Sequence, residues 1–252
     1  MRTKPLSASQ LVELHLCGSV EAVFSAREIT KFQKRNASKI HPLSVRARTL
    51  GGAIQSANIR YGNQLQILIT ALMNQSRKVS VHPLSGCKVQ LPVNDAATSA
   101  IERYVNDRDR APGDFIKDYR KLQTRLKAVR TGSKKKRRDV DLLLKQKGGS
   151  LILVELKFND DHDTGKRPDI YRKVLLTADG LRRELRKPVT PMVCYFNSDA
   201  SPGVRYLPDS QVVNGEKLLK KFAEIEFDEV AMAIRSLGSY FDKKIRSLAR
   251  GI

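Results

Sequence analysis

Two apolar segments joined by a glycine-rich turn constrain the fold of this chain more than any other feature of its sequence. Residues 140–145 and 151–158 are both rich in Val, Leu and Ile, and a Lys-Gly-Gly-Ser segment lies between them at 147–150. Short apolar runs bounded by turn residues are typical of β-strands, and a glycine turn of this length is typical of a β-hairpin. We therefore expect the two segments to pair as neighbouring strands of a sheet.

Apart from Lys145 at the end of the first segment, three charged residues interrupt these apolar segments: Asp141 in the first, and Glu155 and Lys157 in the second. Because side chains alternate between the faces of a strand, Glu155 and Lys157 should share one face, and the hairpin should bring Asp141 alongside Glu155. The alternative is an ordinary ion pair between Glu155 and Lys157 on an exposed strand. Burial of such charges in an apolar sheet without compensation is costly, so their grouping here indicates a functional site.

The residue types at this position favour a hard metal ion. The carboxylates of Asp141 and Glu155, together with the main-chain carbonyl of Leu156, supply the oxygen ligands that Mg²⁺ prefers, and water and a scissile phosphate would complete its coordination. The metal would polarise the phosphate and lower the pKa of an attacking water, while Lys157 would steer that water or stabilise the charge that develops. The sequence therefore predicts metal-assisted phosphodiester hydrolysis.

The rest of the chain predicts helices around further strands, and hence an α/β (α+β) fold. The first 75 residues should be mostly helical, with an apolar helix face at Leu65, Leu68, Ile69, Leu72 and Met73. We expect a short β-hairpin within 78–90, a strand at 189–197, and helices near 96–106, 115–129, 168–185, 215–222 and 228–249. We predict one domain over 1–252, with a helical N-terminal part at about 1–78, a sheet core at about 79–197, and a C-terminal loop and helices at about 198–252.

The charge balance favours a polyanionic partner. The chain has 252 residues, with 47 Lys and Arg against 26 Asp and Glu, a net charge of +21. Phosphate contacts are expected from the basic run before the first hairpin strand and from the segment after the second one. These candidates are Lys134, Lys135, Lys136, Arg137, Arg138, Lys166, Arg167, Arg172 and Lys173.

Several classes of protein are disfavoured by what the sequence lacks. It has no apolar run long enough for a transmembrane helix, no signal peptide and no phosphate-binding loop, so we expect no membrane and no nucleotide cofactor. Its three cysteines are odd in number and widely spaced, which disfavours a disulfide scaffold and fits a cytoplasmic location.

The spacing of Asp141, Glu155 and Lys157 across a hairpin, followed by a helix and a strand, resembles the PD-(D/E)XK nuclease superfamily. The resemblance covers about 134–197 and implies a restriction-endonuclease-like mixed sheet flanked by helices. It also implies one or two Mg²⁺ ions per active site, with Asp141 and Glu155 as acidic ligands and Lys157 as the catalytic lysine. No proline precedes Asp141, which departs from the superfamily's name-giving motif, and Asp139 is a rival for the first acidic position.

The length, helical N-terminal half and basic charge are similar to those of type II restriction endonucleases. This resemblance implies a Mg²⁺-dependent enzyme of a restriction-modification system that cuts double-stranded DNA at a short specific sequence, with a homodimer matching a palindromic site. Two alternatives remain: a structure-specific or repair nuclease such as a Holliday-junction resolvase, and a basic nucleic-acid-binding protein without activity.

Further residues are candidates for base reading and for an accessory role. Base reading would fall to groove-facing loops, either the 78–90 hairpin or the 198–214 loop with Arg205 and Gln211. Many type II restriction endonucleases carry an extra acidic or amide residue on the helix before the sheet, and Gln66, Gln64 and Glu102 are the candidates here.

Overall fold

The computed structural model describes residues 6–17, 22–37, 40–110, 113–129, 132, 134–158, 166–197 and 205–251. Its contacts divide the chain into two units, one formed by 1–72 with 225–252 and the other by 73–224. The single domain over 1–252, with divisions near 78 and 197, stays a prediction.

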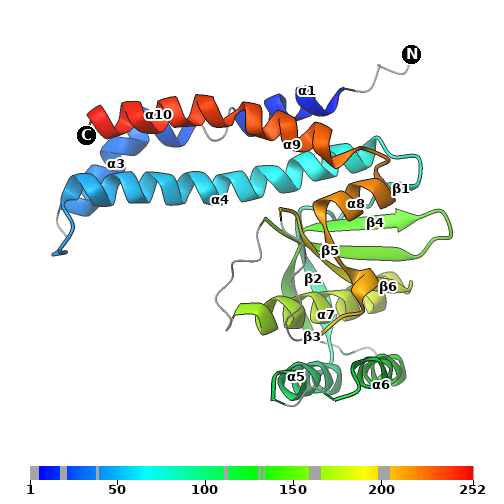
Figure 1. The fold of residues 1–252 in the computed structure, drawn as a ribbon. Coiled ribbons are helices and arrows are strands. Elements are labelled where there is room, and N and C mark those ends of the chain that lie inside the picture. Colours follow the sequence, from blue (N-terminus) through cyan, green and yellow to red (C-terminus); the bar gives the residue numbers. More distant parts are fainter. Residues whose placement is uncertain are drawn as a thin grey trace. The chain divides into compact units, whose positions relative to one another are not determined.

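The described secondary structure of the first unit is helical (Figure 1). Ser7 begins its first helix with a capping box, in which the Ser7 hydroxyl accepts from the Gln10 amide and the Gln10 side chain accepts from the Ser7 amide. Ser44 similarly caps the longest helix by accepting from the amide of Ala47 at 3.1 Å. The elements are α1 (Ala8–Val12), a π-helical turn η1 (Glu13–Cys17), η2 (Ala22–Phe24), α3 (Ala26–Ala37), α4 (Val45–Asn74), α9 (Phe227–Ser236) and α10 (Gly238–Gly251).

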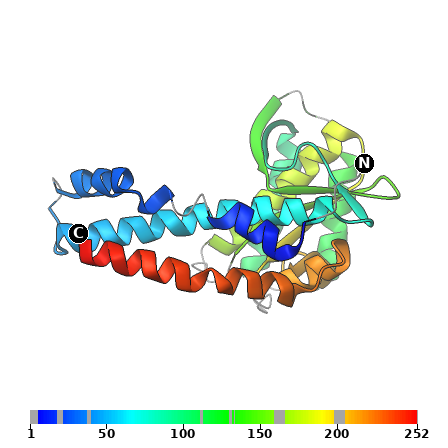
Figure 2. The same ribbon diagram turned by 90° about the horizontal axis from the view of Figure 1, so that it is seen from above.

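Residues from both ends of the chain pack together in this unit. A cluster formed by Val23, Ile29 and Ala53 receives Leu248 from α10, and both views show α10 running alongside α4 (Figures 1 and 2). The helix expected over 228–249 is divided into α9 and α10, because a turn at Leu237, followed by Gly238, ends the first of them.

A mixed five-stranded sheet forms the centre of the second unit. The strand order is β1-β4-β5-β6-β7. β4 pairs antiparallel with both β1 and β5, whereas β6 pairs parallel with both β5 and β7. Helix α7 (Lys166–Leu185) connects the parallel pair β5 and β6, as a parallel crossover requires. The strands are β1 (Val79–Val81), β4 (Leu142–Gln146), β5 (Leu151–Lys157), β6 (Val189–Tyr195) and β7 (Val212–Asn214). The predicted α/β fold with a mixed sheet and a helical N-terminal half is confirmed.

A second sheet corrects the hairpin expected within 78–90. Strand β2 (Cys87–Val93) pairs with β3 (Lys134–Val140), whereas β1 pairs with β4 of the large sheet. The two short strands therefore separate, because the turn between them bonds to the chain around 140–143 instead of closing a hairpin. The basic run also forms most of β3, and the first strand of the predicted hairpin begins at Leu142.

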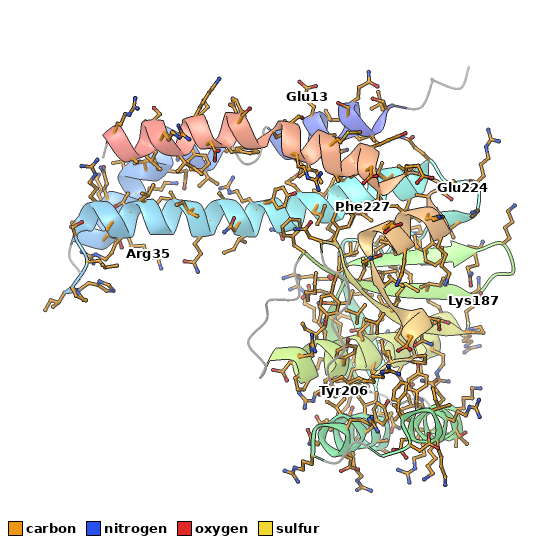
Figure 3. The ribbon with its side chains drawn as sticks, viewed as in Figure 1. Glu13, Arg35, Lys187, Tyr206, Glu224 and Phe227 are labelled. Carbon is orange, nitrogen blue, oxygen red and sulfur yellow. The ribbon has the colours of Figure 1, made fainter. Side chains whose placement is uncertain are left out.

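Helix α7 packs between the sheet and the helices α5 (Asp95–Arg110) and α6 (Phe115–Ala128), whereas α8 (Gly215–Phe222) contacts β6 and β7. Tyr206, labelled in Figure 3, lies between α7 and α5: its ring stacks on Tyr171 with centroids 4.7 Å apart, and its carbonyl accepts from the Tyr104 hydroxyl at 2.9 Å. The buried Arg183 of α7 is paired with Asp179 at 2.7 Å and donates to main-chain carbonyls at the end of α6. None of the helices within the described residues combines the length and the apolar character of a membrane span.

We predict that Gly180→Ala destabilises the protein, although alanine is the better helix former. A Cβ at Gly180 would lie 2.9 Å from Leu91 Cβ and 3.3 Å from the Pro92 carbonyl oxygen, at the contact between α7 and β2. Relief of this overlap should cost about 1–3 kcal/mol in the free energy of unfolding, measured by chemical denaturation.

The matched control is Gly62→Ala in α4, where an added Cβ meets no described heavy atom within 4 Å. That substitution should stabilise the protein by up to about 1 kcal/mol. An equal response of the two variants would contradict the close packing of α7 on β2.

Candidate active site

Main-chain contacts from a neighbouring turn fix the position of Asp141, which lies between β3 and β4. The amide of Gly86, whose φ is 73°, donates to the carbonyl oxygens of Val140 at 2.8 Å and Asp141 at 3.2 Å. The Ser85 hydroxyl accepts from the Leu143 amide at 2.9 Å and donates to the Leu143 carbonyl at 3.1 Å. The turn after β1 thus holds the segment that carries Asp141.

The register of the sheet places Asp141 beside Glu155. Leu142 pairs with Val154 across β4 and β5, so Asp141, one residue earlier, lies across from Glu155 and shares its face. Asp141 Oδ2 accepts a hydrogen bond from the amide of Leu156 at 3.1 Å. The structure therefore brings together the two carboxylates that the hairpin was expected to join.

Two lysines converge on Glu155, whose side chain is only 3% exposed. Glu155 Oε1 accepts from Lys157 Nζ at 2.6 Å and from Lys173 Nζ at 2.7 Å. Lys157 lies two residues along β5, whereas Lys173 reaches the site from α7 and also lies 3.6 Å from Asp141 Oδ1. One ammonium group consequently bridges carboxylates from two different segments of the chain.

The charges of the group perturb each other. Burial, and then the negative charge of Glu155, raise the pKa of Asp141 above its ordinary value, and the two lysines only partly offset this. Burial alone would lower the pKa of Lys173, but Glu155 and Asp141 outweigh it and the pKa is raised. A cation between the two carboxylates therefore stabilises their charged forms.

The donor set fits a divalent cation that prefers oxygen. In the described part of the chain, no group of three or more His, Cys, Asp or Glu side chains could hold a metal ion. Asp141 and Glu155 would be the acidic donors of such an ion, since Mg²⁺ commonly binds one or two carboxylates with water and substrate phosphate. The carbonyl of Leu156 should face the same side as its amide, which contacts Asp141, so this oxygen can complete the set.

Comparison with known proteins decides the family. The sequence model of a family described as "Type II restriction endonuclease, HinfI" matches residues 7–238. The chain belongs to this family. The type II restriction enzyme HinfI of Haemophilus influenzae is 29% identical over 220 residues, which cover 84% of each chain. No solved structure matches the chain. As a HinfI-family restriction endonuclease, the chain is a site-specific deoxyribonuclease by family and has DNA as its substrate.

Asp139, the rival for the first acidic position in this HinfI-family chain, lies on β3. Its carboxylate is 3.7 Å from Lys88 Nζ, and its side chain is 54% exposed. Asp141 is the residue that bonds to β5 and contacts the shared lysine. The geometry favours Asp141 for the acidic position.

The predicted DNA-contacting residues of β3 differ in their surroundings. Lys134 pairs with Asp95 at 3.2 Å and Lys135 with Glu184 at 3.4 Å, while Lys136 and Arg137 are exposed. Arg138 is half-buried, which lowers the pKa of its guanidinium, and its Nε has no hydrogen-bond partner within the described residues.

The other sequence candidates are spread over the HinfI-family chain. Arg172 donates to the Asp169 carboxylate and to Asn106, Arg205 lies 3.5 Å from Asp209, and Gln211 accepts from the Tyr119 hydroxyl at 3.0 Å. Arg167 is half-buried at the start of α7. Two of the accessory candidates, Gln64 and Gln66, lie in α4 of the first unit. Glu102 is exposed on α5. The side chain of Lys166 and residues 198–204 of the predicted loop lie outside the described residues.

The place of Lys173 is the main feature that the sequence reasoning missed, since this residue was assigned to a DNA phosphate. A signal was present. Ile170, Lys173, Val174, Thr177 and Ala178 follow the spacing of one helix face, and four of these five side chains are buried. A lysine on an otherwise buried face needs a partner of opposite charge, and the hairpin carboxylates supply it.

The structure also shows a basic face on α6. Lys117, Arg120, Lys121, Thr124 and Arg125 line a shallow cavity of about 630 Å³, with Asp114 and Ile116. The opposite face of α6 carries the buried Tyr119, Leu122 and Leu126. In the described residues, Lys117, Arg120 and Arg125 have no acidic side chain within ion-pair distance, so their charges face solvent.

We predict that Ser85→Ala disturbs both stability and the active site. The substitution removes both hydrogen bonds to Leu143 next to the Asp141 segment, and should cost about 1–3 kcal/mol in the free energy of unfolding. DNA cleavage by the folded variant should fall, because Asp141 loses part of its support. The exposed Ser80→Ala on β1 is the matched control, and an equally small effect from both variants would argue against this support.

Proposed function

We propose that this HinfI-family chain is a Mg²⁺-dependent endonuclease that hydrolyses phosphodiester bonds of double-stranded DNA at a short specific sequence. The proposal depends on one observation above all: Asp141 and Glu155 share a single cationic group at hydrogen-bond and ion-pair distance. Two carboxylates that hold one positive charge between them can hold a metal ion at the same place. The family match and the name of the relative support DNA cleavage at a specific site.

Each residue of the site has a distinct role in this proposal. Asp141 keeps Oδ1 directed toward the shared cation because its Oδ2 is held by the Leu156 amide. Glu155 and the Leu156 carbonyl complete the protein ligands, and bound Mg²⁺ supplies Lewis acidity toward the phosphate and toward a water molecule. Lys157, whose Nζ lies 2.6 Å from Glu155, places positive charge where negative charge develops on the phosphate.

The order of the elements supports membership in the PD-(D/E)XK superfamily. A hairpin of β4 and β5 carries the two carboxylates, α7 follows it, and β6 then pairs parallel with β5. This is the arrangement that the resemblance implied for about 134–197. Val140 stands where the superfamily motif has a proline before the acidic residue. It ends β3, and its carbonyl oxygen accepts a hydrogen bond from the Gly86 amide.

The basic face of α6 supports contact with a DNA backbone in addition to the cations of β3. Lys117, Arg120 and Arg125 recur along one side of α6, at spacings of one to two helix turns. Their free charges can neutralise phosphates, whereas Lys134 and Lys135 would first have to leave their acidic partners. We assign backbone contacts to both surfaces and base reading to groove-facing loops.

A homodimer is the simplest assembly for this activity, because cutting both strands of a palindromic site needs two active sites related by a two-fold axis. We propose that the enzyme acts as such a dimer, in the cytoplasm where DNA would be cut. The alternatives of a junction-specific nuclease and of a basic binding protein without activity make different predictions for the products of digestion.

We predict that Asp141→Asn and Glu155→Gln each slow cleavage strongly while leaving DNA binding, measured without a divalent ion, intact. Each change removes one carboxylate of the pair at nearly constant shape, so the rate should fall on the order of 10²–10³-fold or more. Wild-type enzyme with Mg²⁺ should cut a long linear DNA into discrete fragments whose ends share a sequence, and chelation of the metal should stop the reaction.

Asp139→Asn is the matched control, since it removes a nearby acidic group that contacts Lys88 instead of β5. Loss of cleavage in Asp139→Asn but not in Asp141→Asn would overturn the assignment of the ligands. A smear, or cutting of junctions alone, would indicate the structure-specific alternative, and DNA binding with no cleavage at all would indicate the binding protein.

We predict that the triple substitution Lys117→Gln, Arg120→Gln and Arg125→Gln weakens DNA binding and flattens its salt dependence. Three lost phosphate contacts should reduce the slope of log K against log salt by about 2–3. Fluorescence anisotropy over a series of salt concentrations gives this slope.

The control removes the same charge from α8 with Lys217→Gln, Lys220→Gln and Lys221→Gln. It should change the slope much less, because only the net charge is altered. Equal slopes for the two triple variants would remove α6 from the DNA-binding surface.

A further inference from the structure

Lys173 holds a position in the candidate active site that Lys157 does not share. Its Nζ lies 2.7 Å from Glu155 Oε1 and 3.6 Å from Asp141 Oδ1, so it contacts both carboxylates. Among the acidic side chains that the structure describes, Lys157 forms an ion pair only with Glu155, at 2.6 Å. The Lys173 ammonium thus occupies the position between the two carboxylates where a divalent ion would bind.

The surroundings of Lys173 allow its charged end to move while its helix stays in place. The neighbours Ile170, Val174 and Thr177 are buried, so this part of α7 is fixed by packing. The Lys173 side chain is itself 35% exposed, compared with 3% for Glu155. Four rotatable carbons connect its ammonium to the backbone, so the group can leave the carboxylates without any change in α7.

We propose that Lys173 is a resident counter-cation, which neutralises Asp141 and Glu155 in the metal-free enzyme and must be displaced for a divalent ion to bind. This inference depends on the proposed metal site. It assigns Lys173 a positioning role, in which the displaced ammonium becomes available to a DNA phosphate at the same edge of the sheet.

A coupling between metal and DNA follows from this competition. In the free enzyme, the ion must replace an existing charge-assisted interaction, which weakens its binding. A DNA phosphate offers the ammonium a second partner, so DNA lowers the cost of its displacement. Because such coupling is reciprocal, DNA should strengthen metal binding and the metal should strengthen DNA binding by the same factor.

The test measures Mn²⁺ binding to the full-length free protein by calorimetry, with no DNA present. Lys173→Met keeps the length of the side chain and removes its charge, so it should bind Mn²⁺ at least about tenfold more tightly than wild type. Lys173→Arg keeps the charge and should retain the weak affinity. In chelator, Lys173→Met should have a lower melting temperature than wild type, and Mn²⁺ should raise it more.

Arg172→Gln is the matched control, because it removes one positive charge from the adjacent position of α7, where Arg172 contacts Asp169 and Asn106. Its Mn²⁺ affinity should stay close to that of wild type. If Lys173→Met fails to fold, Lys173→Gln serves for the same comparison. An unchanged or weaker Mn²⁺ affinity in the folded, neutral variant would overturn the proposal.

The failure of this inference can be separated from the failure of the metal site itself. If wild type and Lys173→Met bind Mn²⁺ equally and Asp141→Asn abolishes binding in both, the metal site stands and the role of Lys173 is refuted. If Asp141→Asn leaves Mn²⁺ binding unchanged in both backgrounds, the ion binds elsewhere and the proposed function loses its metal ligands.

Discussion

The antiparallel register of β4 and β5 is the constraint on which the candidate site depends. With Leu142 opposite Val154, Asp141 and Glu155 fall on one face, and a slip by one residue would send one of them to the other side of the sheet. The register is stabilised from outside the hairpin, since Gly86 and Ser85 bond to the chain just before and within β4.

Buried charge explains why the two lysines are where they are. Glu155 is almost fully buried, and an isolated carboxylate there would be very unfavourable. Lys157 comes from the same strand and Lys173 from the helix that follows it, so one βα unit supplies both counter-charges. The two lysines therefore supply the charge that the buried carboxylate needs for stability.

The sequence predicted the parts of this arrangement that depend on local pattern. The hairpin, the faces of Glu155 and Lys157, and the nearness of Asp141 all follow from strand alternation and a glycine turn. The pairing of β1 with β4 and of β2 with β3 does not, because it depends on hydrogen bonds from Ser85 and Gly86 to residues nearly 60 positions away. The contact of Lys173 with the carboxylates was not predicted for a related reason: its partners lie on other elements, and only its place on a buried helix face indicates them. The DNA-phosphate contact of Lys173 stays a prediction.

The first unit is built from both ends of the chain, with the second unit inserted between them. Helix α1 packs against α9, and Leu248 completes a cluster begun by Val23. During synthesis, the helices of 1–72 consequently cannot pack against α9 and α10 until more than 220 residues have been made. A ribosome-bound nascent chain can thus form the sheet that carries the carboxylates before the helical unit has all of its contacts. The two units can therefore complete their folding at different times.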